Sequence, residues 1–160
     1  MQGRLVDIKA GKLTYGQRIE LGEIFQNEKL SEAKKFKAAL KCMLGEKYAV
    51  KWQWEEVKIF EKIIEGVQFW AEREKSMLHY EPTADELAAG YKQLGERLGV
   101  MSTVMTLAQK FGKDPDEILE WEYGKVFGLL YADLEQYKFG KRYQAVLDAK
   151  YKTPKRPWSK

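Results

Sequence analysis

Apolar residues recur at helical spacing along most of the chain, and capping residues mark where several of these patterns start. Thr14 and Gln17 form a capping box, which predicts a helix over residues 15–26. A second pattern, with a serine before it and a glycine after it, predicts a helix over residues 31–45. A third apolar stripe predicts a long helix over residues 54–75.

The strongest periodic signal follows a capping box at residues 83–86. Its apolar positions recur at steps of three and four residues; they are Leu87, Tyr91, Leu94, Leu98, Met101, Met105, Ala108 and Phe111. The pattern predicts one long helix that ends at Gly112, with this stripe facing the core. The stripe also fits a coiled-coil seam, but about three heptads are the minimum for one, so we favour a core helix.

The last part of the chain predicts two more helices. Residues 114–117 read DPDE, which supplies an N-cap, a proline at the first helical position and acids in the first turn. The apolar spacing then continues until Gly140, which we expect to break the helix. A final helix over residues 141–151 is expected to bury Val146 and Leu147.

Two short segments alternate apolar and polar residues as strands do. They are residues 4–13, where the alternation is weak, and residues 48–54, which contain two tryptophans and for which we predict a strand or an extended segment. The patterns together predict a mostly α protein, with five to six helices in a single compact bundle-like domain over residues 1–151 and a short N-terminal β element. Residues 152–160 contain two prolines and are expected to form an extended basic C-terminal tail.

The composition narrows the chemistry that this chain can perform. Its 160 residues are 44% hydrophobic and 32% charged, as expected for one soluble globular domain. The single cysteine, Cys42, excludes an intramolecular disulfide, and we expect it to be a buried, inert thiol. The single histidine, His79, effectively excludes zinc sites built from histidine and cysteine.

No motif in the sequence points to catalysis. One cluster of carboxylates occurs at a predicted helix start; its members are Asp114, Asp116, Glu117, Glu120 and Glu122. Paired carboxylates can exchange protons or hold Mg²⁺, but acids at this position also suit the positive end of the helix dipole, which we favour. His79 lies in a predicted loop without a partner placed by any motif. We expect a non-enzymatic protein without cofactors and without catalytic, cofactor-binding or metal-binding residues.

Charge is distributed unevenly, and the asymmetry points to partner contacts. Residues 138–160 hold eight basic residues and one acidic residue, while the whole chain carries a net charge of +4. Trp121 lies off the apolar stripe of its helix and is expected to be partly exposed. The partner-binding residues that we predict are Trp121, Tyr151, Lys155, Arg156 and Trp158. Basic residues between stacking rings also leave single-stranded nucleic acid open as a partner, although no defined binding motif is present.

The sequence predicts a cytoplasmic protein that does not contact a membrane. The longest apolar stretch, residues 126–132, is far shorter than the ~20 residues of a membrane-spanning helix. The first residues lack the apolar core of a signal peptide.

Three segments near the C-terminus form a recognisable pattern. They are residues 107–112 (LAQKFG), residues 114–121 (DPDEILEW) and a helix that begins at residues 123–126 (YGKV). This pattern resembles phage tail assembly chaperones. Residues 13–21 (LTYGQRIEL) also look like small proteins encoded among phage structural genes. The helix predicted at residues 54–75 and the basic tail have no counterpart in the resemblance.

The resemblance implies a small, helical, non-enzymatic protein that acts in the host cell cytoplasm. Such chaperones bind the tape-measure protein, sometimes together with tail-tube subunits, and keep it soluble while the tail polymerises. Helix-in-groove contacts would suit this role, and Met101 and Met105 are candidates for them. No catalytic residue carries over from the resemblance.

Two other functions stay open at this point. The chain could be a structural virion component, such as a head–tail connector or a minor capsid protein, and would then remain in the particle. It could instead be a small nucleic-acid-binding helical protein, whose binding would weaken with salt. Assembly into a homo-oligomer is compatible with each of these functions.

Overall fold

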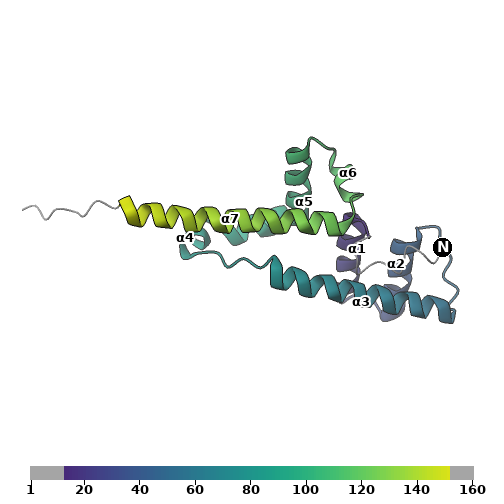
Figure 1. The fold of residues 1–160 in the computed structure, drawn as a ribbon. Coiled ribbons are helices and arrows are strands. Elements are labelled where there is room, and N and C mark those ends of the chain that lie inside the picture. Colours follow the sequence, from purple (N-terminus) through teal and green to yellow (C-terminus); the bar gives the residue numbers. More distant parts are fainter. Residues whose placement is uncertain (1–12, 152–160) are drawn as a thin grey trace, which may run out of the picture.

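The computed structural model describes residues 13–151, apart from the side chains of residues 94–98, and Figure 1 shows its helices. They are α1 (Tyr15–Gln26), α2 (Glu32–Leu44), α3 (Trp54–Met77), α4 (Ala84–Ala88), α5 (Tyr91–Phe111), α6 (Pro115–Leu119) and α7 (Tyr123–Tyr151). The prediction of a mostly α protein is confirmed. Because α5 is interrupted at Gly99, the described residues form eight helical segments rather than the predicted five to six.

Local capping starts α1, α4 and α6 where the sequence predicts. The Thr14 side chain accepts a hydrogen bond from the N–H of Gln17 at 3.2 Å, and the Gln17 side chain accepts one from the N–H of Thr14 at 3.0 Å. Thr83 and Glu86 form the same reciprocal pair at the start of α4. The helices predicted over residues 15–26, 31–45 and 54–75 are confirmed as α1, α2 and α3.

The segment predicted as one long helix after residue 83 is broken twice. α4 ends at Ala88, and Gly90 adopts a φ of 91° before α5 begins. Gly99 adopts a φ of 51° and a ψ of −153°, a conformation that only glycine reaches readily, and this kinks α5. Both turns redirect the chain, so its apolar stripe does not lie on one straight helix face. α5 ends at Gly112, as predicted.

Residues 48–53 form a loop, so the strand predicted there is wrong. The carboxylate of Glu56, only 2% exposed, accepts the N–H groups of Lys51 and Gln53 at 2.9 and 3.0 Å. A strand would offer these N–H groups to a neighbouring strand, whereas here a side chain takes them. The loop therefore folds back onto the first turn of α3.

The N-terminal β element expected at residues 4–13 lies outside the described residues, apart from Leu13. From Leu13 to the end of α7 the structure contains no strand. Thr14 and Glu122 form an isolated antiparallel bridge, which is flanked by two backbone hydrogen bonds of 2.8 Å. This bridge joins the start of α1 to the turn between α6 and α7.

The predicted break at Gly140 does not occur, and α7 continues through it to Tyr151. A glycine lowers the stability of a helix by about 0.5–1 kcal/mol relative to alanine without ending it. The break lies earlier, at residues 120–122 between α6 and α7. Val146, which was expected to be buried, is 63% exposed because no described element covers the end of α7.

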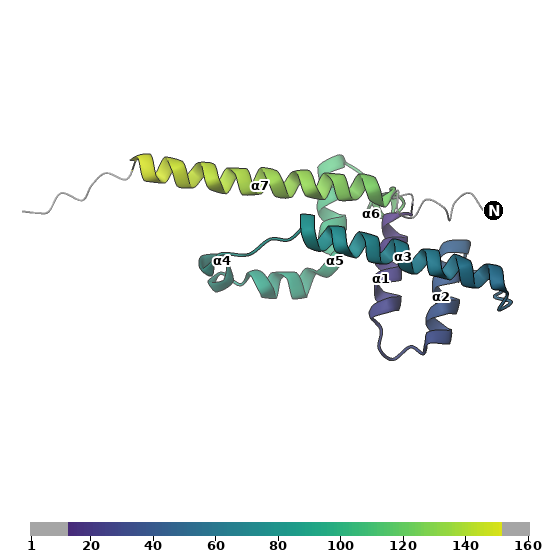
Figure 2. The same ribbon diagram turned by 60° about the horizontal axis from the view of Figure 1, so that its bottom comes forward.

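The core is one cluster of buried residues to which every helix except α4 contributes. The fully buried side chains are Leu21, Leu40, Ile63, Val104, Leu107, Ile118 and Val126. Trp70 of α3 packs edge-on against Tyr123 and Phe127 of α7, with ring centroids 5.0 and 5.2 Å apart. Figures 1 and 2 show that the end of α7 extends beyond the other helices in both views. The core therefore supports only the first part of α7.

Candidate functional site

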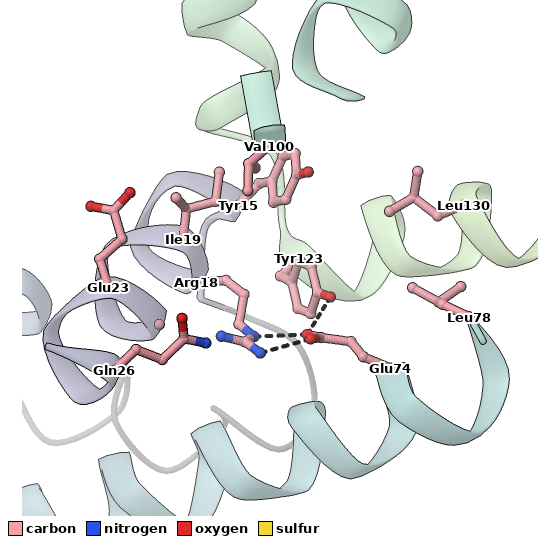
Figure 3. A pocket seen from close by; sticks show the side chains of 11 residues that line it. Tyr15, Arg18, Ile19, Glu23, Gln26, Glu74, Leu78, Val100, Tyr123 and Leu130 are labelled. Atoms are coloured by element: carbon pink, nitrogen blue, oxygen red, sulfur yellow. Dashed lines mark hydrogen bonds and ion pairs between the residues drawn. The ribbon is translucent and has the colours of Figure 1, made fainter. Parts of the chain in front are cut away.

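A pocket of about 340 Å³ lies where α1, α5, the end of α3 and the start of α7 meet (Figure 3). Its polar side chains include Arg18, Glu74 and Tyr123, and its apolar wall consists of Ile19, Leu78, Val100 and Leu130. We call it the central pocket. Its volume is at the lower end of the range for small-molecule sites.

An ion pair forms the polar side of the central pocket. Arg18 donates from Nε and Nη2 to the two carboxylate oxygens of Glu74, with both distances 2.8 Å. The hydroxyl of Tyr123 donates to the same carboxylate at 2.6 Å. The ring of Tyr15 stacks on that of Tyr123, with centroids 5.8 Å apart. Figure 3 shows these side chains converging from three helices.

Burial keeps the tyrosines of this pocket protonated. Burial, followed by the hydrogen bond to Glu74, raises the pKa of Tyr123. Burial also raises the pKa of Tyr15, against a hydrogen bond with Thr103 that lowers it. A phenol with a raised pKa does not act as a base near neutral pH. The charge of the Arg18 guanidinium is neutralised by the ion pair with the Glu74 carboxylate. A molecule bound in the central pocket would therefore contact chiefly its apolar wall.

A second polar cluster ties α4 to α7. The carboxylate of Glu86 accepts hydrogen bonds from the hydroxyls of Tyr80 and Tyr137, at 2.7 and 2.5 Å, and from the ammonium group of Lys141. Lys141 and then Tyr137 hold the pKa of Glu86 well below its usual range. The hydrogen bond to Glu86 raises the pKa of Tyr80 to about 12. This cluster fixes the loop after α3 against the middle of α7.

Two tryptophans lie where the loop before α3 enters the helix, Trp52 in the loop and Trp54 as the first residue of α3, and we call them the tryptophan corner. Trp52 adopts a φ of 58°, an unfavourable conformation for a residue with a side chain. Its ring stacks on Phe36 with centroids 4.9 Å apart and an interplanar angle of 11°. Both tryptophans are exposed, and the hydrogen bonds to the Glu56 carboxylate hold the loop that carries Trp52.

The apolar stripe predicted for the core is largely at the surface. Met101 and Met105 are 52% and 55% exposed, and we call this pair the methionine face of α5. Among the described side chains of α5, the buried ones are Val104, Leu107 and Ala108. The core role predicted for the two methionines is therefore wrong. As exposed flexible side chains, they suit contact with an apolar partner.

The last part of α7 carries a further apolar surface. Phe139, Tyr143 and Val146 are 62%, 55% and 63% exposed, and we call them the outer face of α7. Phe139 stacks on Tyr143 with an interplanar angle of 11°.

The structure describes two of the five predicted partner-binding residues. Trp121 is partly exposed, as expected, but the Lys125 ammonium group covers its ring at 3.7 Å and Phe111 packs against its edge. Tyr151 is exposed at the end of α7. The other three residues, Lys155, Arg156 and Trp158, lie outside the described residues. The structure does not bring Trp121 and Tyr151 together, because they lie at opposite ends of α7.

Sequence reasoning missed the surface on α7 and the tryptophan corner, and it named Met101 and Met105 as candidates for helix contacts while favouring a core role for them. The steps of four and three residues between Phe139, Tyr143 and Val146 were a usable signal, because the basic residues among them disfavour burial. The central pocket left no comparable signal, since its ion pair joins residues 56 positions apart.

The remaining reactive side chains have ordinary structural surroundings. His79 is exposed, with Nε2 3.5 Å from a carboxylate oxygen of Glu81. Burial, followed by the nearby Glu20, raises the pKa of the partly buried Cys42 thiol. Asp114 caps α6 by accepting the N–H of Asp116 at 2.9 Å. In the described part of the chain, no group of three histidine, cysteine, aspartate or glutamate side chains could hold a metal ion.

The chain was compared with families and proteins already known. No protein-family model, curated protein or solved structure matches it. Of the helices between residues 13 and 151, none has the length and apolarity to cross a membrane.

Proposed function

We propose that this chain is a non-enzymatic phage tail assembly chaperone that binds an apolar helix of the tape-measure protein in the host cytoplasm. The observation that carries the proposal is the exposure of the methionine face, Met101 and Met105, one helical turn apart on α5. Methionine side chains are flexible and polarisable, so they can adapt to different apolar stripes along a long partner.

The fold around the resembling segments supports the same proposal. Residues 13–21 and residues 114–121 meet beside the bridge between Thr14 and Glu122, where the N–H of Tyr15 donates to the carbonyl of Trp121 at 2.8 Å. Two segments that separately resemble phage proteins thus form one structural unit. The methionine face lies on α5, whose buried residues Val104 and Leu107 belong to the same core.

The test is capture of the tagged chain from infected or prophage-induced cells, with chemical crosslinking and mass spectrometry. We expect a tape-measure protein, with or without tail-tube protein, to crosslink near α5, and purified particles to lack the bait. The double variant Met101→Glu/Met105→Glu should lose this partner. The matched control is Thr106→Glu/Gln109→Glu, which adds the same charge to exposed positions of the same helix.

Other outcomes would overturn the proposal in favour of a different function. Capture of capsid or connector proteins, with the bait retained in the particles, would identify a structural virion component. Capture of nucleic acid without a phage protein, sensitive to salt, would identify a nucleic-acid-binding protein. Equal loss of the partner in both double variants would mean that the methionine face is not the binding surface.

A further inference from the structure

The outer face of α7 is an apolar strip on a helix that points away from the core. Phe139, Tyr143 and Val146 are spaced by four and three residues, so they share one side of the helix. Each of them is more than half exposed. The opposite side is occupied, because Tyr137 and Lys141 contact Glu86 near α4.

Two cations, Arg142 and Lys150, flank this strip. Arg142 is three residues after Phe139 and four before Val146, and Lys150 is four residues after Val146, so both border the strip. Neither forms an ion pair with any residue that the structure describes.

The other charged groups of this segment are already engaged. Lys138 pairs with Glu135 at 3.2 Å, and Lys141 pairs with Glu86. Asp148 accepts a hydrogen bond from Gln144 at 3.0 Å, on the side of the helix away from the strip. The strip is therefore apolar with a positive border.

This pattern of charge selects among the partners that an apolar helix face could take. We propose that the outer face of α7 docks an acidic amphipathic α-helix of a protein partner. The apolar residues of that helix pack on Phe139, Tyr143 and Val146, and its flanking carboxylates meet Arg142 and Lys150. The proposal goes beyond the function assigned to the methionine face and does not depend on it.

Two other occupants suit the surface less well. A second copy of the chain, packed face to face, would bring Arg142 and Lys150 against the same cations, and like charges disfavour such pairing. Nucleic acid is held mainly by contacts to many phosphates, whereas the strip offers two cations that form no ion pair with a described residue. Val146 also gives a base no ring on which to stack.

The experiment uses the full chain and two synthetic peptides of 21 residues. Both carry leucine at the a and d positions of three heptads; one carries glutamate at e and g, and the other carries lysine. The like charges keep each peptide from pairing with itself. Fluorescence anisotropy of the labelled peptides, at low and high salt, then measures binding to the chain. We expect the chain to bind the acidic peptide at least about tenfold more tightly than the basic one at low salt.

Charge reversal provides the decisive variant. We expect Arg142→Glu/Lys150→Glu to exchange the preference, so that the basic peptide binds more tightly. The variant Phe139→Asp/Val146→Asp should bind neither peptide, because it removes the apolar strip. The matched control is Lys37→Glu/Lys62→Glu, which reverses two exposed charges on α2 and α3 and should keep the original preference. Circular dichroism and the melting temperature establish that each variant is folded.

Several results would overturn the proposal. The first is equal binding of the two peptides to the chain. The second is a preference for the acidic peptide that stays unchanged after charge reversal at Arg142 and Lys150. The third is a change of preference in the Lys37/Lys62 control that equals the change in the Arg142/Lys150 variant. A single-stranded oligonucleotide of 20 thymidines provides a further test. If it binds the chain and the charge reversal at Arg142 and Lys150 abolishes that binding, the face is assigned to nucleic acid instead. Light scattering that shows a dimer, abolished by Phe139→Asp/Val146→Asp, would assign it to a second copy.

Discussion

Arg18 of α1 and Glu74 of α3 form a bidentate ion pair across 56 positions of the sequence, with both N–O distances 2.8 Å. The side chains are 13% and 30% exposed, so water screens the pair only in part. Because Tyr123 also donates to Glu74, one carboxylate joins three helices. This contact sets how α1, α3 and α7 meet around the central pocket.

Replacing this carboxylate is expected to loosen the junction. Glu74→Gln removes the charge opposite Arg18 and should lower the free energy of unfolding by about 1–3 kcal/mol. Urea denaturation followed by circular dichroism measures the change. The control is Glu32→Gln, which removes an ion pair to Lys35 from a side chain that is 84% exposed, and which should change stability by less than about 0.5 kcal/mol. Equal effects of the two substitutions would contradict the role given to Glu74.

The two sides of α5 should respond differently to truncation. Leu107 is buried, and Leu107→Ala should lower the free energy of unfolding by about 2–5 kcal/mol, because it leaves a cavity. Met105 is 55% exposed, and Met105→Ala should stay within about 0.5 kcal/mol of the unchanged protein. Thermal and chemical unfolding of both variants compare the two values. A large loss of stability in Met105→Ala would place that residue in the core after all.

The cluster around Glu86 should make the attachment of α4 sensitive to acid. Because Lys141 and Tyr137 lower the pKa of Glu86 in the folded protein, its contribution to stability is complete above the ordinary pKa of 4.5. The contribution is lost progressively as the pH falls from there toward the lowered pKa. The difference in melting temperature between the unchanged protein and Glu86→Gln should therefore be constant from pH 8 to about pH 5.5 and shrink below it. A difference that grows toward low pH would have the wrong sign for this mechanism.

The loop of the tryptophan corner should depend on one buried carboxylate. The backbone N–H of Lys51, ahead of the other donors, lowers the pKa of Glu56. Glu56→Gln replaces one of the two acceptor oxygens by an NH2 donor and removes the negative charge, so the amides of residues 51–53 should exchange hydrogen at least about tenfold faster. Hydrogen exchange with mass spectrometry measures this, and Glu55→Gln, the exposed neighbour, is the control. Unchanged protection in Glu56→Gln would mean that the loop is held by the stacking of Trp52 on Phe36.

The sequence by itself determined where α1, α4 and α6 start, because capping is local. Thr14 and Gln17, like Thr83 and Glu86, satisfy each other's backbone groups within three residues, so the pattern alone suffices. The partial exposure of Trp121 also followed from its place beside the apolar stripe of its own helix.

Only the tertiary structure decided which apolar stripes are buried and which polar groups meet. Periodicity shows that Met101 and Met105 share a side of a helix, but burial depends on whether another element covers that side. Residues 48–53 alternate apolar and polar positions but form a loop, because the carboxylate of Glu56 accepts their backbone N–H groups. The ion pair between Arg18 and Glu74 joins segments that no local pattern relates. Those contacts depend on how the chain folds back on itself, and local spacing carries no information about that.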